Sequence, residues 1–284
     1  MKQSSLPLSN NNKTDLLYEC ENDMRRRILT DEPSTVHLAS GGSRTRARIC
    51  ITAGQQLGLQ KHDILCLAST VELLHNASLI HDDVQDEDNV RRGTEALWKR
   101  YGAARAICSG DVMISAAYGA IADLRCSAKI SDILRETHEA VAETIRGQSL
   151  DLSSDLNIEP EQYEKIAAMK SGPLFRLALS LPLLVANRRD LLPKVQYVAA
   201  RFAVAYQIND DLDDWLEDEK NGDLNIVNLL ASRSSINEAL FVAKNRAKYL
   251  LRKCQRELSN FPNDSAHIVE QLTFKLMNQV EKHY

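Results

Sequence analysis

Two clusters of aspartate are the residues of this sequence best suited to chemistry. In residues 79–93, LIHDDVQDEDNVRRG, five acidic residues occupy the seven positions from Asp82 to Asp88, and two arginines follow them. Residues 206–218, YQINDDLDDWLED, repeat the Asp-Asp-x-x-Asp spacing. Carboxylates four residues apart lie on one face of an α-helix and repel each other unless a cation neutralises them. Each cluster therefore indicates a candidate cation site.

The cation that such clusters favour is magnesium. Mg²⁺ binds one or two carboxylates and completes its coordination with water and phosphate oxygens. Neither cluster has the glycine and terminal glutamate of a calcium-binding EF-hand loop. A solvated acidic helix end is the alternative for a single cluster. Two clusters at apolar-to-polar helix junctions, the first followed by Arg91 and Arg92 with fork-shaped donors for phosphate, favour a site for metal and diphosphate.

The composition limits the class of protein. The chain has 284 residues, 44% of them hydrophobic, and a formal net charge of −4, which favours a sizeable core and gives no electrostatic reason to expect nucleic acid as a partner. The six cysteines form no CxxC pair, so we expect free thiols in a reducing compartment. The N-terminus lacks the apolar core of a signal peptide, and no run approaches the roughly 18 apolar residues of a membrane span. We therefore expect a cytoplasmic protein without a stable membrane span.

The elements that position the aspartates are predicted to be helices. Long tracts without proline or glycine, such as 223–261, carry apolar residues at helical spacing, which predicts an all-α fold. Residues 66–80 and 174–186 are apolar on more than one face, as helices at the centre of a bundle are. No break resembles an interdomain linker. We expect one helical domain over residues 14–284 after a flexible N-terminus at 1–13.

The last segment carries its own helical signal. Asp264 and Ser265 offer an N-cap. Behind them, apolar residues recur every four positions, at Ile268, Leu272, Leu276 and Val280. This spacing predicts a C-terminal helix with one buried face.

The two acidic motifs together resemble the aspartate-rich motifs of the trans-polyprenyl diphosphate synthases, which join isopentenyl diphosphate to allylic diphosphates. The likeness covers roughly residues 38–230 and is closest in motif to geranylgeranyl and long-chain synthases. It implies the isoprenoid synthase fold, a bundle of long helices around a central apolar cavity, and a homodimer. Further landmarks match in order: GGSRTR (41–46), VELLHNASLIHDD (71–83), Gly110-Asp111, GQSLDL (147–152) and KSGPLF (170–175).

The resemblance also implies a role for each matching residue. The site would hold three Mg²⁺, with Mn²⁺ as a possible substitute, and Asp82, Asp86 and Asp210 would bind them directly. Asp83, Asp211 and Asp214 would support these ligands, partly through water. The allylic diphosphate would be bound by Arg91, Lys170, Gln207 and Lys220. The isopentenyl diphosphate would be bound at the positions of Ser43, Arg46, His75 and Arg92. The catalytic group would comprise Asp82, Asp86, Asp210, Lys170 and Arg91.

The implied reaction is ionisation, condensation and elimination. Breaking the allylic C–O bond leaves a carbocation and a diphosphate, whose charge the metal and the cationic side chains stabilise. The double bond of isopentenyl diphosphate then attacks the carbocation, and loss of a proton gives a trans-polyprenyl diphosphate. No Ser/His/Asp or Cys/His arrangement indicates nucleophilic catalysis.

Departures from the family pattern leave the acceptor open. Ser43 stands where the family has the lysine of Gly-Gly-Lys-x-x-Arg, and Arg44 is a candidate to replace it. After Asp214, Lys220 is followed by no second lysine. The alternative is therefore a class I terpene cyclase, or a prenyltransferase to another acceptor, that uses the same ionising site. A third hypothesis, a non-catalytic subunit of a heteromeric synthase, conflicts with the intact aspartates.

Product length depends on the residues just before the first motif. In the family, bulky aromatics four and five residues before the first aspartate close the chain pocket. Here these positions are Ser78 and Ala77, both small, which predicts a product of C20 or longer. Met113 or Tyr118 on a neighbouring helix could close the pocket again.

Overall fold

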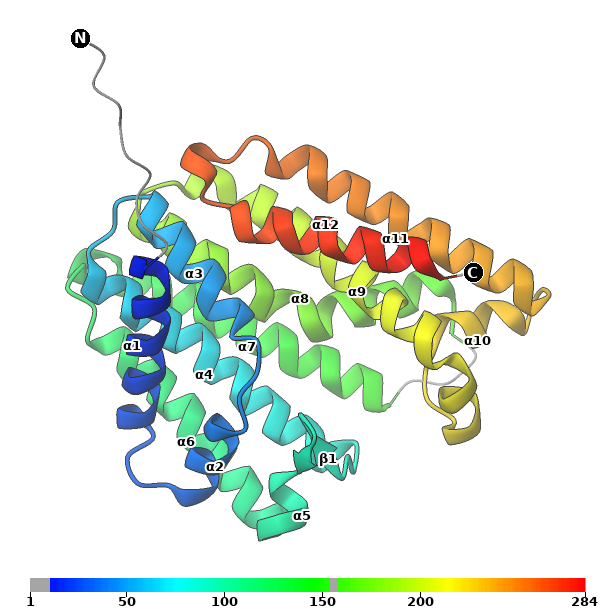
Figure 1. The fold of residues 1–284 in the computed structure, drawn as a ribbon, viewed down its shortest axis with the longest axis horizontal. Coiled ribbons are helices and arrows are strands. Elements are labelled where there is room, and N and C mark those ends of the chain that lie inside the picture. Colours follow the sequence, from blue (N-terminus) through cyan, green and yellow to red (C-terminus); the bar gives the residue numbers. More distant parts are fainter. Residues whose placement is uncertain (1–10, 154–157, 284) are drawn as a thin grey trace. The chain divides into compact units, whose positions relative to one another are not determined.

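The computed structural model describes residues 11–153 and 158–283 (Figure 1). Helices account for 81% of the described residues, which confirms the all-α prediction. The strands found among the described residues form one short hairpin, in which β1 (Val90–Arg91) pairs antiparallel with β2 (Thr94–Glu95). Of the stretch expected to be flexible, residues 1–10 lie outside the described residues, and residues 11–13 begin a helix.

The chain divides into two compact units. Unit 1 comprises residues 1–52 and 60–125, and unit 2 comprises residues 53–59 and 126–284. The expectation of a single domain stays a prediction. The elements of unit 1 are α1 (Asn11–Arg27), α2 (Glu32–Ala39), most of α3 (Thr45–Gln56), α4 (Lys61–Gln85), the hairpin, α5 (Leu97–Tyr101) and α6 (Ala103–Ala122).

Helix α4 is the core of unit 1. It packs against α1, α5 and α6, and twelve of the fifteen residues from 66 to 80 are buried, as the apolar composition of this segment predicted. Burial of one large apolar side chain stabilises a fold by about 1.5–3 kcal/mol. Asp31 caps α2 by accepting the Ser34 N–H at 2.9 Å, and it also accepts the Ser109 hydroxyl at 2.8 Å, which ties α2 to α6.

Unit 2 is built around α8. This helix packs between α7 and α9, and α11 packs against α9 and α12 (Figure 1). Residues 174–184 of α8 are all buried, which confirms the prediction of a central helix. The elements are η1 (Ser127–Lys129), α7 (Ile130–Leu152), α8 (Pro160–Val185), η2 (Arg189–Leu191), α9 (Leu192–Asn221), α10 (Ile226–Ala231), α11 (Ile236–Leu258), η3 (Pro262–Asp264) and α12 (His267–Lys282).

The C-terminal helix exists, but its predicted N-cap is wrong. Asp264 ends the short turn η3, and α12 begins at His267 after Ala266, with no side-chain cap. Ile268 and Leu272 are only part-buried, because packing on α11 turns a neighbouring face of the helix inward. That face consists of Val269, Thr273, Leu276, Met277 and Val280.

Two helices have the length and apolar composition of a membrane span, although no such run was expected from the sequence. By length and composition α4 and α8 are each apolar enough to cross a membrane. In both, 72% of the most apolar stretch is buried inside the structure, as in the core helices of folded domains. The predicted cytoplasmic location stays a prediction. All six cysteines are free thiols, as expected, and four of them are buried.

Candidate active site

The first acidic motif forms the C-terminal end of α4. Asp83 faces inward and is 1% exposed, Asp82 is part-buried, and Asp86 is exposed as the C-cap residue. The Asp86 N–H donates to the Asp82 carbonyl at 2.8 Å. The motif therefore ends a buried helix at the surface, where carboxylate oxygens can meet a ligand.

Arg91 neutralises the buried carboxylate of this motif. Its Nε donates to Asp83 Oδ1 at 2.6 Å, and its guanidinium also pairs with Asp88 at 3.1 Å. Burial raises the pKa of Asp83, and the bond from Arg91 opposes that rise. Asp83 Oδ2 is buried without a hydrogen-bond partner among the described residues. Arg91, which was predicted to bind the allylic diphosphate, is therefore paired with carboxylates in this structure.

The Gly110-Asp111 landmark gives room to a histidine beside the motif. A Cβ on Gly110 would lie 2.1 Å from His81 Nε2, so only glycine leaves space for the ring. His81 Nε2 lies 3.3 Å from the Ile107 carbonyl and 3.7 Å from Asp111. This contact positions the turn of α4 that carries Asp82.

The second arginine, Arg92, points away from the acids into a group of cations. Its guanidinium donates to the Gly41 carbonyl and, at 3.2 Å, to Asn76 Oδ1. It also lies so close to Gly42 that a Cβ there would meet it at 2.7 Å. Burial and the nearby charge of Arg44 lower the pKa of Arg92. The glycine pair is thus the surface on which this guanidinium packs.

Two histidines complete the basic cluster, which we define as His37, Arg44, Arg46, His75 and Arg92. Burial, followed by the charge of Arg92, lowers the pKa of His37 to about 3. Burial and the charges of Arg46 and Arg92 hold the pKa of His75 well below its usual range. His37 Nε2 is buried with no hydrogen-bond partner among the described residues. The positive charge of the cluster therefore comes from Arg44, Arg46 and Arg92, and this concentration of guanidinium groups favours an anion.

Arg44 does not replace the missing lysine. It is 4% exposed, and its guanidinium bonds Glu21 at 3.0 Å and the Leu38 carbonyl at 2.6 Å, with Glu72 at 3.9 Å. Because these groups already bind it inside the fold, it is not available to a ligand at the surface. Ser43 is exposed and shares a hydrogen bond of 2.7 Å with Thr45.

The second acidic motif lies in α9, and its inward-facing residue is Asp211. This side chain is 2% exposed. Its Oδ2 accepts the Tyr163 hydroxyl at 2.7 Å and the Ile226 N–H at 2.6 Å, and its Oδ1 accepts Gln207 Nε2 at 3.0 Å. Burial raises the pKa of Asp211 to about 6, against the lowering effect of these bonds. Asp211 therefore fixes Gln207 and the start of α10.

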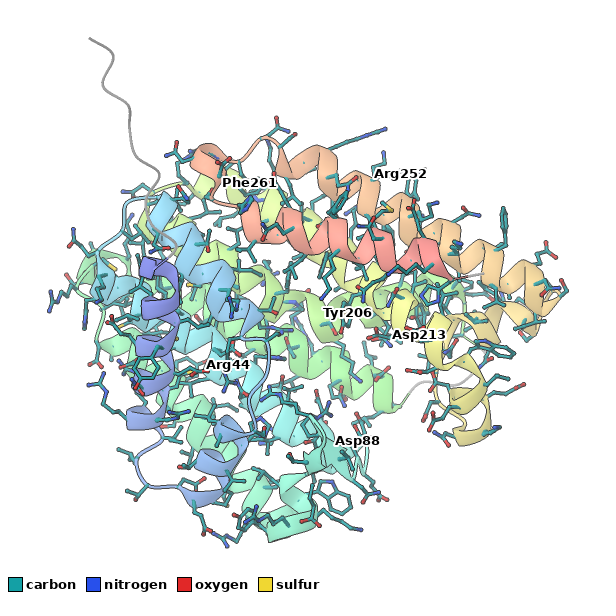
Figure 2. The ribbon with its side chains drawn as sticks, in the orientation of Figure 1. Arg44, Asp88, Tyr206, Asp213, Arg252 and Phe261 are labelled. Atoms are coloured by element: carbon teal, nitrogen blue, oxygen red, sulfur yellow. The ribbon has the colours of Figure 1, made fainter. Side chains whose placement is uncertain are left out.

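Asp210 and Asp214 are the outward-facing members of the same motif. Asp214 is exposed and Asp210 is part-buried; Figure 2 marks this stretch of α9 by Tyr206 and Asp213. Burial, and then the neighbouring carboxylates, raise the pKa of Asp210 to about 7. Nearby, His283 lies 3.1 Å from Asn209 Oδ1. A cation bound at Asp210 would offset the repulsion between this carboxylate and its neighbours.

Lys170 lies at the crossing of α7 and α8. Its Nζ bonds Asp151 Oδ2 at 2.5 Å. A Cβ on Gly147 would come within 2.3 Å of the Lys170 backbone nitrogen, so glycine permits this close crossing. The GQSLDL segment thus contributes helix packing and also supplies the carboxylate for the lysine. Lys220 is exposed near the end of α9.

The residues expected to set product length lie on α4. Ala77 is 1% exposed, and the Ser78 hydroxyl donates to the His75 carbonyl at 2.9 Å. On α6, Met113 is fully buried and Tyr118 is part-buried. The chain-length pocket beside α4 stays a prediction.

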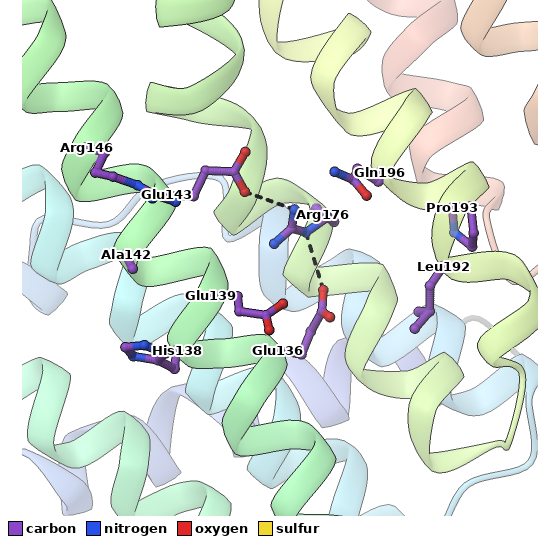
Figure 3. A pocket seen from close by; sticks show the side chains of 10 residues that line it. All are labelled: Glu136, His138, Glu139, Ala142, Glu143, Arg146, Arg176, Leu192, Pro193 and Gln196. Atoms are coloured by element: carbon purple, nitrogen blue, oxygen red, sulfur yellow. Dashed lines mark hydrogen bonds and ion pairs between the residues drawn. The ribbon is translucent and has the colours of Figure 1, made fainter.

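A separate pocket of 540 Å³ in unit 2 contains none of the predicted site residues (Figure 3). Arg176 of α8 reaches into it and pairs with Glu143 at 3.0 Å and Glu136 at 3.3 Å, both on α7. Burial raises the pKa of Glu136. Because two glutamates already neutralise Arg176, we interpret this group as a structural link between the helices.

Comparison with known proteins agrees with these features. The family model described as polyprenyl synthetase matches residues 28–228. The chain belongs to this family. A short chain isoprenyl diphosphate synthase from Methanocaldococcus jannaschii is 29% identical over 64% of this chain and 57% of its own length. The chain thus spans less than two thirds of the length of that curated relative. The same holds for a short chain isoprenyl diphosphate synthase from Methanothermobacter thermautotrophicus, of which it covers 58%.

Solved structures share the fold of this polyprenyl synthetase family member. A geranylgeranyl pyrophosphate synthetase from Geoglobus acetivorans has a TM-score of 0.82 at 21% identity and covers 93% of this chain and 98% of its own. A polyprenyl synthase from Caulobacter crescentus, complexed with calcium and isoprenyl diphosphate, has a TM-score of 0.81 at 22% identity and covers 96% and 97%. The isoprenoid synthase fold inferred from the motifs is confirmed.

Several residues of the site were missed by sequence reasoning. His37 and Glu72 are isolated polar residues in apolar stretches, and Tyr163 lies seven positions before Lys170. The only signal was a polar side chain on an otherwise buried helix face, which says nothing about its partner. Asp151 could have been suspected, because it lies within the GQSLDL landmark.

Proposed function

We propose that this protein is a magnesium-dependent prenyltransferase. It condenses isopentenyl diphosphate with an allylic diphosphate to give a trans-polyprenyl diphosphate. Membership of the polyprenyl synthetase family supports the reaction class, and the curated relatives include short chain isoprenyl, farnesyl and geranylgeranyl diphosphate synthases. The residues of unit 1 support two separate diphosphate sites.

The observation that carries this proposal is the opposite orientation of Arg91 and Arg92. Arg91 turns to the carboxylates of α4. Arg92 binds no carboxylate among the described residues and donates instead to Gly41 and Asn76. Its strongest charged neighbour is Arg44. A diphosphate bound through metal suits the acidic side, whereas a diphosphate bound without metal suits the basic side. Adjacent residues thus serve two different anions, as a condensation of two diphosphates requires.

The donor set of the acidic motifs fits Mg²⁺. The described residues contain no group of three or more acidic, histidine or cysteine side chains arranged to hold an ion alone. Mg²⁺ commonly takes only one or two carboxylates and leaves the other positions to water and substrate phosphate. Asp82 and Asp86, and Asp210 and Asp214, supply such pairs four residues apart. Bound there, Mg²⁺ would neutralise charge on a leaving diphosphate.

The chain's own residues divide the remaining work. Arg91 and Lys170 exchange Asp83 and Asp151 for oxygens of the allylic diphosphate. Arg46, His75 and Arg92 hold the second diphosphate. Buried Asp83 and Asp211 keep their helices fixed, and Asp211 orients Gln207 beside the allylic substrate. The small side chains of Ala77 and Ser78 support a product of C20 or longer.

The basic cluster also bears on the alternative reaction. A terpene cyclase has a single diphosphate to bind, and it gains nothing from a second cationic site. The proximity of Arg46 and Arg92 to His75 therefore favours chain elongation over cyclisation.

Product analysis tests the proposal. The protein is incubated with Mg²⁺ and geranyl or farnesyl diphosphate, with and without isopentenyl diphosphate, and the products are identified by mass spectrometry. Elongated diphosphates that require isopentenyl diphosphate support the proposal, and the Asp82→Ala variant should form none. A hydrocarbon or alcohol formed equally well without isopentenyl diphosphate would contradict it.

A further inference from the structure

Backbone carbonyls at the end of α2 and in the loop before α3 bind three guanidinium groups. Arg44 binds the Leu38 carbonyl, Arg92 binds the Gly41 carbonyl, and Arg48 Nε donates to the Ser43 carbonyl at 3.0 Å. Figure 2 labels Arg44 at the start of this group. Like charges repel, so three cations bound to carbonyls between residues 38 and 43 need nearby negative charge.

The three arginines differ in how their charge is compensated. Arg44 has Glu21 and Glu72 within ion-pair distance. Arg92 is partly buried against Asn76. The Arg48 side chain is exposed, and among the described residues it bonds only the backbone carbonyl of Ser43. A carbonyl oxygen carries no net charge, so the charge of Arg48 is left to water or to a ligand.

The bond to Ser43 also fixes where this charge lies. It uses one N–H of the five in the guanidinium, and the two terminal nitrogens remain available in a planar fork that matches phosphate oxygens. The bond holds the guanidinium beside the backbone of Ser43, the position at which the family pattern has a lysine. We propose that Arg48 binds the diphosphate of the acceptor substrate and supplies the charge that Ser43 lacks. This inference rests on the proposed function for the identity of that substrate.

Steady-state kinetics test the inference in the full chain. Arg48→Ala should raise the KM for isopentenyl diphosphate about tenfold, because a hydrogen bond between charged groups is lost. The KM for the allylic diphosphate should change less than twofold. Adding Ser43→Lys to Arg48→Ala should restore the KM for isopentenyl diphosphate. An unchanged KM in Arg48→Ala, or no restoration in the double variant, would overturn the inference.

A matched control separates this effect from a general loss of surface charge. Arg105 is an exposed arginine of α6 with a Glu32 carboxylate at 3.7 Å. Arg105→Ala removes the same charge and should leave both KM values unchanged. Equal changes in the Arg105→Ala and Arg48→Ala variants would show a nonspecific electrostatic effect and overturn the inference.

A binding experiment does not depend on turnover. Titration with inorganic diphosphate in EDTA measures the anion site without metal, and Arg48→Ala should weaken this binding about tenfold. Arg92→Ala is the positive control. If the wild type shows no elongation but Arg48→Ala still weakens diphosphate binding, the proposed reaction fails and the anion site stands. Equal affinity of wild type and Arg48→Ala for diphosphate would show that Arg48 is not part of the anion site and would overturn the inference.

Discussion

At the level of single residues, the second aspartate of each motif differs from the other two. Asp83 and Asp211 are 1% and 2% exposed, and both are hydrogen-bonded within the protein. A step of one residue turns a helix by about 100°, whereas a step of four returns nearly to the same face. The first and fifth positions therefore face outward together, while the second anchors the motif. The predicted grouping of carboxylates on one helix face is consistent with this pattern.

The anchor role predicts a structural cost for removing one hydroxyl. Tyr163→Phe removes one of the two donors to Oδ2 of buried Asp211, which should destabilise the protein by about 1–3 kcal/mol. Urea unfolding measures this difference. Because Asp211 also holds Gln207, kcat should fall as well. Tyr249→Phe, an exposed tyrosine on α11, is the control and should change neither quantity; equal stability of Tyr163→Phe and the wild type would refute the anchor.

Asp210 predicts an unusual pH dependence. Its pKa is raised to about 7 in the folded state, above the roughly 3.9 of an unfolded aspartate. The folded protein therefore binds a proton more tightly, and stability from this group is full below pH 4 and is lost as the pH rises through 7. In EDTA, the melting temperature of the wild type should fall more between pH 5 and 8 than that of Asp210→Asn. Parallel curves would contradict the assignment.

At the level of elements, the crossing of α7 and α8 controls the placement of Lys170. Gly147 lies against the Lys170 backbone, and Asp151 one turn later receives the ammonium group. Two side chains of ordinary size at this contact would separate the helices. The segment from Gly147 to Asp151 therefore sets both the close approach of α7 and α8 and the position of the Lys170 ammonium group.

Gly147→Ala should disrupt this crossing. The added methyl group would overlap backbone atoms that have no room to move, so we expect a loss of about 1–3 kcal/mol in unfolding free energy and a higher KM for the allylic diphosphate. Gly119→Ala in α6 is the matched control, because its Cβ meets nothing within 4 Å. That variant should gain up to about 1 kcal/mol from helix propensity. Equal melting temperatures of Gly147→Ala and the wild type would contradict this account.

The sequence was informative about elements and less so about partners. The apolar runs at 66–80 and 174–186 predicted buried helices correctly, because a helix that is buried on all sides is apolar on all its faces. The pairing of Arg91 with Asp83 could not be predicted, since the hairpin that returns Arg91 to α4 depends on tertiary packing. The same holds for Tyr163 and Asp211, which are 48 residues apart. Arg44 was wrongly considered as a substitute for the lysine, because the motif does not indicate that this side chain is buried.

At the level of the whole molecule, α7 carries an exposed apolar stripe. Ile145 is 60% exposed, Leu152 is 52% exposed and Leu134 is 38% exposed. Their spacings of eleven and seven residues place them on one helix face. Aligned apolar side chains in water are costly, and a second copy of the chain would cover them. The stripe supports the homodimer implied by the family resemblance, which stays a prediction.

Ile145→Asp should therefore shift the protein from dimer to monomer. A buried unpaired carboxylate would oppose association. Light scattering after size-exclusion chromatography distinguishes one copy of 31.9 kDa from two. Phe274→Asp on α12, at a side chain that is 61% exposed, should leave the dimer intact. A wild type that elutes as a monomer would refute the dimer.

The pairing of Arg91 with Asp83 makes metal and anion interdependent ligands. A diphosphate that captures Arg91 would release a buried carboxylate, whose charge then requires another counterion. Magnesium arriving at the end of α4 would meet that requirement, so each ligand would raise the affinity for the other by the same factor. The enzyme would then favour the complete metal–substrate complex over either component alone, and occupancy would rise steeply once both are present.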